Sequence, residues 1–135
     1  MKERYRENTY VKLWVEDGVI YEIFKSDIEI DLEAAKAIVE DRLVVSNGET
    51  MPLFADTRNV LSMDRKAIKY LNQERGVHLL SAGAFYIDSK FQVYLYNLLM
   101  RVKKPPIPAK MFYNKEEALE WLQIFKQMDW ENTKN

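Results

Sequence analysis

The stretch VKKPPIPAKMFYNKEEALEWL, residues 102–122, decides the fold because it combines a helix stop, a short strand and a new helix. Pro105 and Pro106 cannot continue a helix, and a proline also disfavours helical geometry in the residue before it. The apolar run AKMFY then predicts a short strand. Asn114 can cap the helix that follows, with Glu117 at the spacing of a capping box. The stretch therefore predicts a helix, a strand and a helix in succession.

Upstream, the pattern predicts a β-hairpin and two further strands. TYVKLWVED alternates polar and apolar residues, and VIYEIF follows after Asp17 and Gly18. Asp-Gly between two β-rich runs is a strong hairpin signal, because glycine adopts positive φ without strain. The apolar run MPLFAD predicts a buried strand, and AGAFYI predicts another strand.

Three further helices are predicted from apolar residues at helical spacing. DLEAAKAIVEDRLVVSNG begins at a possible cap, Asp31, and ends at Asn47-Gly48. The next helix has Ser62 as its predicted cap and Asp64 in its first turn. The third is DSKFQVYLYNLLMRVKK, and its apolar side chains are expected to face the core: Phe91, Tyr94, Leu95, Leu98, Leu99 and Val102.

The element order is β-β-α-β-α-β-α-β-α, which predicts an α/β fold. We expect a mixed, mostly parallel five-stranded sheet flanked by about four helices. A chain of 135 residues can bury one core, so a single domain is predicted over residues 1–135. Its core is expected at about residues 8–126, with tails at 1–7 and 127–135.

Composition narrows the class of protein. The chain is 47% hydrophobic and 30% charged, with net charge −1 and no cysteine. The absence of cysteine excludes disulfides and thiolate nucleophiles, and the net charge gives no reason to expect nucleic acid. No signal-peptide core and no apolar run of about 20 residues is present. We therefore expect a cytoplasmic protein without a transmembrane segment.

No arrangement of residues predicts catalysis. His78 is the only histidine, no nucleophile elbow is present, and the four glycines are too widely spaced to form a phosphate loop. The acidic residues of SDIEIDLE lack the pattern of a calcium loop and suit the edge of a strand. We therefore expect no enzyme activity, no catalytic residues, no metal and no cofactor.

Two loops at strand ends are candidates for a switch or a ligand site. Ligands of open α/β sheets bind beyond the carboxyl ends of strands. A phosphate or carboxylate could meet Arg58 and the helix start near Ser62; alternatively, Asp56 and Arg58 pair with each other. The candidate residues are Asp56, Thr57, Arg58, Ser62, Asp88 and Ser89.

A second candidate is a cationic surface. Residues 89–115 contain six cationic side chains and no acidic one, a net +6, so the remainder of the −1 chain carries −7. Such a segment suits an anion, or it is a solvated face. The aromatic helix inside it is a core element, or it presents a tyrosine to a partner. The candidate residues for an anionic ligand or partner are Tyr94, Tyr96, Arg101, Lys103 and Lys104.

The segment AGAFYIDSKFQVYLYNLLMRVKKPPIPAKMFYNKEEALEWL resembles the STAS-like, SpoIIAA-like family of small bacterial proteins. The resemblance extends over about residues 8–126 and implies a sheet flanked by helices. Related STAS domains are anti-sigma-factor antagonists that are switched by phosphorylation of a Ser or Thr at a helix start. The matching loop here is ADTRNVLSMD, which offers Thr57 and Ser62 and has no glycine. The SpoIIAA-like branch has also been likened to lipid-carrying domains.

These observations predict a non-enzymatic regulatory or protein-interaction domain resembling anti-sigma-factor antagonists. Its partner would be another protein or a second copy of the chain in a homodimer. The alternative is a carrier or sensor of a small apolar or lipid-like ligand, in which the cationic segment meets an anionic lipid.

Overall fold

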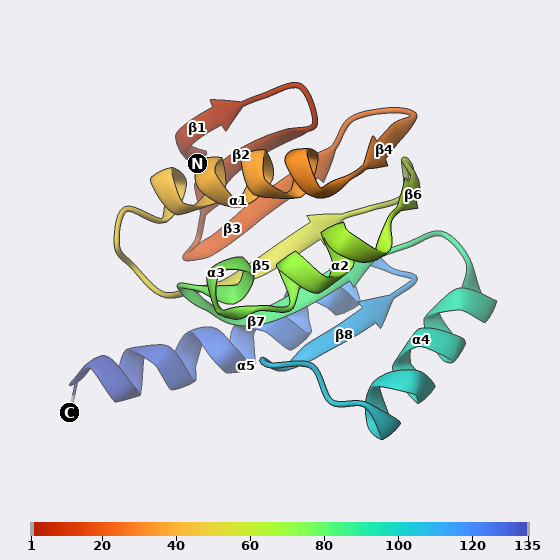
Figure 1. Ribbon diagram of the computed structural model, residues 1–135. Helices are drawn as coiled ribbons and strands as arrows, with labels where there is room; N and C mark the ends of the chain where they lie inside the picture. Colours follow the sequence, from red (N-terminus) through yellow and green to blue (C-terminus); the bar gives the residue numbers. More distant parts are fainter. Residues whose placement is uncertain (1, 135) are drawn as a thin grey trace.

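The computed structural model of the chain describes residues 2–134, with side chains for residues 2–126, and shows an α/β fold with two sheets (Figure 1). The strands are β1 (Glu3–Glu7), β2 (Val11–Glu16), β3 (Val19–Phe24), β4 (Ile28–Ile30), β5 (Met51–Asp56), β6 (Val60–Met63), β7 (Leu80–Tyr86) and β8 (Ala109–Phe112). The helices are α1 (Leu32–Ser46), α2 (Arg65–Leu71), α3 (Glu74–Val77), α4 (Lys90–Val102) and α5 (Lys115–Lys134).

The main sheet has six strands in the order β1-β2-β3-β5-β7-β8, and β4 pairs with β6 in a small second sheet. Strand β2 pairs antiparallel with β1 and with β3, whereas the pairs β3–β5, β5–β7 and β7–β8 are parallel. The predicted α/β class with a mixed sheet is confirmed. The structure adds β1, β4 and β6 to the five predicted strands.

Strand β1 lies where the pattern predicts a tail, over residues 1–7. It pairs with β2, and the Arg4 guanidinium donates to the carbonyl oxygens of Val45 and Ser46, each at 3.1 Å. The sequence ERYRE of β1 is polar and largely exposed, so it lacks the alternation that identifies a strand. Pairing with the edge of β2 therefore decides its conformation.

The predicted hairpin is confirmed. Strands β2 and β3 pair in register up to Glu16 and Val19, and the two residues between them, Asp17 and Gly18, have φ of 51° and 74°. Positive φ at both central positions matches a type I′ turn, whose twist suits the flanking strands.

Helices cover both faces of the main sheet (Figure 1). One face packs against α1 and α2 in a buried cluster that includes Leu13, Ile20 and Ile38. The opposite face packs against α5 through a second cluster that includes Phe54 and Leu122. Strand β5 lies between the two clusters and is buried along almost its whole length, as the run MPLFAD predicts.

Side-chain caps set most helix starts. The Asp31 carboxylate accepts from the Ala34 N–H at 2.8 Å, and the Asn114 side chain accepts from the Glu117 N–H at 3.0 Å, so both predicted caps are confirmed. The predicted cap at Ser62 is wrong, because Asp64 accepts from the Ala67 N–H at 2.8 Å and Ser62 lies in β6. Pairing of β6 with β4 keeps the backbone extended up to Met63.

Helix α5 continues to Lys134 and so includes most of the predicted C-terminal tail, residues 127–135. The side chains of that segment lie outside the described residues.

Helix α4 differs most from prediction, because it has no buried residue. It lies at the β8 end of the sheet and projects from the body (Figure 1). The expectation that its apolar side chains face the core is wrong: their exposed fractions range from 38% for Leu95 to 85% for Val102. The amphipathic pattern is present, but the large side chains of its apolar side remain exposed.

Candidate functional site

The two candidate loops meet at the carboxyl ends of β5 and β7. Asp56 ends β5, Tyr86 ends β7, and the two residues are register partners in neighbouring parallel strands. The Thr57 backbone N–H and its hydroxyl both donate to the Tyr86 carbonyl oxygen, each at 3.0 Å. The loops after the two strands are therefore held side by side.

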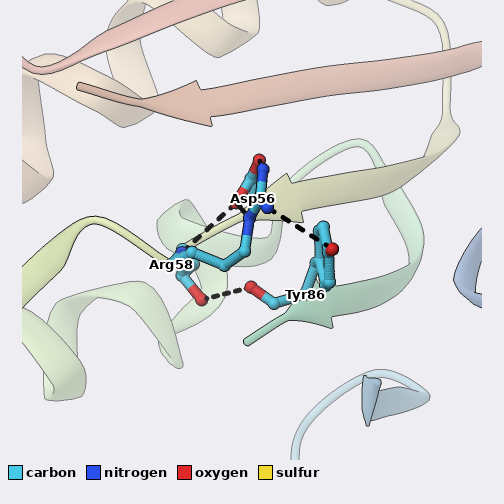
Figure 2. A network of polar contacts seen from close by, with 4 residues as sticks. Asp56, Arg58 and Tyr86 are labelled. Atoms are coloured by element: carbon cyan, nitrogen blue, oxygen red, sulfur yellow. Dashed lines mark hydrogen bonds and ion pairs between the residues drawn. The ribbon is translucent and has the colours of Figure 1, made fainter. Parts of the chain in front are cut away.

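Arg58 folds back onto this junction, as Figure 2 shows. Its Nε donates to Asp56 Oδ1 at 2.9 Å and its Nη2 to Asp56 Oδ2 at 2.8 Å. The guanidinium lies 4.3 Å from the centroid of the Tyr86 ring, and Nη1 is 3.4 Å from the Tyr86 hydroxyl. A two-point pair of this kind is stronger than a single ionic contact, and the aromatic face adds cation–π attraction.

The Asp56 hydrogen bonds are the largest cause of a raised Arg58 pKa, and Asp88 raises that pKa further through its charge. Of the two alternatives open from the sequence, the internal Asp56–Arg58 pair is therefore the one that forms. An anion at Arg58 would compete with a carboxylate already in place. Tyr86 belongs to this cluster, but the sequence did not single it out because it stands inside the predicted strand.

The other loop candidates have different surroundings. Ser62 is exposed in β6, opposite Glu29 of β4, so a phosphate on Ser62 would lie across from a carboxylate. Ser89 caps α4 by accepting from the Gln92 N–H at 3.2 Å. The structure thus brings Asp56, Thr57, Arg58 and Asp88 together, while Ser62 and Ser89 serve a strand and a helix cap.

Helix α4 attaches to the sheet through its polar side. The Asn97 side-chain amide donates to the Met111 carbonyl oxygen at 3.0 Å and accepts from the Met111 N–H at 2.8 Å. Asn97 thereby satisfies one residue of the edge strand β8 in the way that another strand would. Val93 and Met100, on the same side of the helix, are half-buried.

The opposite side of α4 carries its large apolar side chains. At 3.6 residues per turn, Leu95 and Val102 point roughly 140–180° away from Val93 and Asn97, and Leu98 points roughly 100–140° away from them. We call this surface the α4 apolar face, and its exposed members are Phe91, Tyr94, Leu95, Leu98, Leu99 and Val102. Contiguous apolar surface of this kind marks interaction sites more often than scattered exposed residues do.

The predicted cationic surface divides into separate parts. Tyr94 belongs to the α4 apolar face, Tyr96 is exposed on another side of the helix, and Lys103 is the C-cap residue. Arg101 and Lys104 instead line a groove of about 460 Å³. The other residues that line it are Asn97, Met100, Pro105, Pro106, Ile107, Pro108, Ala109 and Lys110.

Two buried ionisable residues were not anticipated. Glu22 of β3 is 6% exposed and Arg42 of α1 is 1% exposed. Arg42 donates to the carbonyl oxygens of His78 at 2.8 Å and Gly76 at 3.2 Å. Burial raises the pKa of the Glu22 carboxyl to about 7, although the Arg42 charge opposes the rise. A signal existed, since Glu22 shares a strand face with the buried Ile20.

Residues 2–126 hold no group of three His, Cys, Asp or Glu side chains that could bind a metal ion. None of the helices in the described part of the chain combines the length and the apolar character that crossing a membrane requires.

Comparison with known proteins identifies the family of the chain and its fold. Residues 13–126 match the family model described as a domain of unknown function, DUF7793, so the chain belongs to that family. Its structure resembles the crystal structure of an uncharacterized protein of the DUF3478 family from Shewanella loihica PV-4, which has a SpoIIAA-like fold. The TM-score is 0.59 at 15% identity, over 87% of this chain and 98% of the other. The predicted SpoIIAA-like fold is confirmed. No curated protein matches the chain.

Proposed function

We propose that this STAS-like domain is a non-enzymatic interaction module that docks a protein partner through the α4 apolar face. The observation that carries the proposal is that α4 is amphipathic, has no buried residue and turns its apolar side away from the body. Covering a large apolar side chain contributes about 1.5–3 kcal/mol when burial is complete. A partner that covers several of these side chains therefore gains substantial binding free energy.

Charge indicates the chemistry of that partner. Residues 89–115, which include α4, contain six cationic side chains and no acidic one. An amphipathic partner segment with acidic side chains beside its apolar ones would complement this helix. A second copy fits less well, because a symmetric antiparallel contact between two α4 helices would bring Lys90 of one copy near Arg101 of the other.

In this proposal the Asp56–Arg58 junction is the control point. The Asp88 charge acts on Arg58, and Ser89, the next residue, caps α4. A change at Thr57 or Arg58 can therefore reach the first turn of the docking helix through Asp88 and Ser89. This arrangement supports the regulatory role that the resemblance to anti-sigma-factor antagonists implies.

Photo-crosslinking in the native host tests the proposal. A photoreactive residue at Leu98 would be compared with one at Lys36, which is exposed on α1. We expect a specific captured protein at Leu98 alone. With that protein purified, Leu98→Ser combined with Val102→Ser should weaken binding by roughly tenfold or more. Added salt should weaken it further. Equal capture at both positions, or capture only of a second copy, would contradict the proposal.

The second candidate function is a carrier or sensor of a lipid-like ligand. The exposed Phe91 and Tyr94 beside the cationic end of α4 favour it, because amphipathic helices at membrane surfaces have this composition. Native mass spectrometry with organic extraction separates the two functions. A stoichiometric mass that extracts as lipid would support the carrier, whereas a bare protein mass supports the interaction module.

A further inference from the structure

We propose that the groove between the end of α4 and the start of β8 binds a small phosphate-bearing anion. This site goes beyond the docking function, because it lies on the Asn97 side of α4 and not on the α4 apolar face. Its volume of about 460 Å³ falls within the range of small-molecule sites.

The groove is preformed. Pro105, Pro106 and Pro108 line it, and the proline ring fixes φ at each position. The two hydrogen bonds between Asn97 and Met111 hold the α4 wall against the β8 wall. A ligand therefore meets walls that are already in position and loses less free energy to ordering than it would on a mobile loop.

Three cationic residues from three successive segments line the groove, and the Lys110 ammonium lies 5.4 Å from the centroid of the Phe112 ring. Arg101 comes from the last turn of α4, Lys104 precedes the prolines, and Lys110 comes from β8. No acidic residue occurs between Asp88 and Glu116. Among the described side chains, none of the three cations forms an ion pair with a carboxylate.

The donor set favours a phosphate. Arg101 offers a planar fork that matches two phosphate oxygens, and the two lysines add point charges. A phosphate with charge near −2 is attracted to several cations more strongly than a single carboxylate is. The apolar side chains of Met100 and Ile107 also line the groove and suit a non-polar part of the same ligand.

The test uses pyrophosphate, inorganic phosphate and glycerol 3-phosphate as probes, with isothermal titration calorimetry and thermal unfolding at low ionic strength. We expect pyrophosphate to bind and to raise the Tm of the wild-type chain. Lys104→Gln combined with Lys110→Gln should weaken binding by roughly tenfold or more, because each substitution removes a charged hydrogen-bond donor to the phosphate. Circular dichroism checks that the variant is folded.

Lys103→Gln is the matched control, because Lys103 is an exposed cation at the same helix end and does not line the groove. Binding to that variant should stay within about twofold of wild type, the change expected from a distant, screened charge. No binding of any probe at millimolar concentration would overturn the proposal. So would an equal loss in Lys103→Gln and in the groove variant, since that outcome would mean diffuse charge attraction.

The phosphate could belong to a free metabolite or to a lipid headgroup, and vesicle flotation separates these sources. Vesicles of phosphatidylcholine with phosphatidic acid would be compared with vesicles of phosphatidylcholine alone. Flotation that Lys104→Gln with Lys110→Gln abolishes would assign the phosphate to a headgroup, whereas soluble binding without flotation would assign it to a free ligand. Leu98→Ser with Val102→Ser should retain pyrophosphate binding, which keeps the groove distinct from the docking surface.

Discussion

Glu22 shows how one residue can link stability to pH. Its carboxyl is buried beside the apolar cluster on the α1 side of the sheet, and Arg42 only partly offsets the cost of ionisation. The folded-state pKa of about 7 lies above the ordinary value of an unfolded glutamate. The folded protein therefore holds this proton more tightly than the unfolded chain. The resulting stability is complete below about pH 4.5 and is lost as pH rises through about 7.

Glu22→Gln should remove this pH dependence. The loss in wild type amounts to about 3 kcal/mol, since each pKa unit corresponds to 1.36 kcal/mol. From pH 5 to pH 8 the free energy of unfolding of the wild type should therefore fall relative to that of Glu22→Gln. Urea unfolding at both pH values measures it. Glu120→Gln, on the exposed side of α5, should show no such trend, and a flat difference for Glu22→Gln would contradict the assignment.

Thr57 allows a test of the proposed control point. Thr57→Val removes the hydroxyl bond to the Tyr86 carbonyl and should cost about 1 kcal/mol of stability. Thr57→Glu removes the same bond and adds a carboxylate next to Asp56 and near Asp88. If the loop is a switch, Thr57→Glu should change partner affinity while Thr57→Val does not. The affinity is measured by calorimetry with the purified partner that photo-crosslinking identified. Unchanged affinity in both variants would count strongly against a switch.

At the scale of elements, α4 is the least anchored helix of the described chain. None of its residues is buried, and its side-chain hydrogen bonds to another element are those of Asn97 with Met111. A helix of this length is only marginally stable without tertiary contacts. The two bonds therefore do much to decide where the apolar face points.

Asn97→Ala should release α4 from β8. We expect hydrogen exchange of the α4 amides to become at least roughly tenfold faster, because two hydrogen bonds of about 1 kcal/mol each are lost. Exchange in β3 and β5 should be unchanged. Gln92→Ala, an exposed position of the same helix, is the control. Unaltered exchange in α4 would show that other contacts hold the helix.

At the scale of the whole molecule, β1 decides where the main sheet ends. It covers the edge of β2, and Arg4 binds the carbonyl oxygens at the end of α1. Without β1, the edge of β2 would be open to pairing with another chain, which is a common route to aggregation. The N-terminal segment is therefore part of the sheet and joins β2 to α1.

Deletion of residues 1–7 should destabilise the protein and promote association. The two Arg4 bonds alone account for about 2 kcal/mol of the expected loss. Thermal unfolding and size-exclusion chromatography measure the two effects. Glu3→Gln, at an exposed position of β1 whose side chain forms no ion pair among the described residues, should change neither. If the protein without residues 1–7 is fully stable and monomeric, this expectation is wrong and the folded core is residues 8–126, as the sequence predicts.

Local chemistry let the sequence predict much of the fold. The Asp17-Gly18 turn, the caps at Asp31 and Asn114, and the proline stop after α4 each depend on residues a few positions apart. Such signals do not need the rest of the molecule. Together with the alternation of strands and helices, they determine the α/β class and the hairpin, and the SpoIIAA-like resemblance agrees with them.

Tertiary structure decided the features that depend on which surfaces meet. An apolar stripe on α4 is the same in sequence whether it is buried or exposed, and only the placement of α4 beside β8 shows that it is exposed. The Asp56–Arg58 pair, its contact with Tyr86, and the burial of Glu22 beside Arg42 likewise arise between distant segments. Local patterns specify what a residue prefers, and packing specifies what it meets.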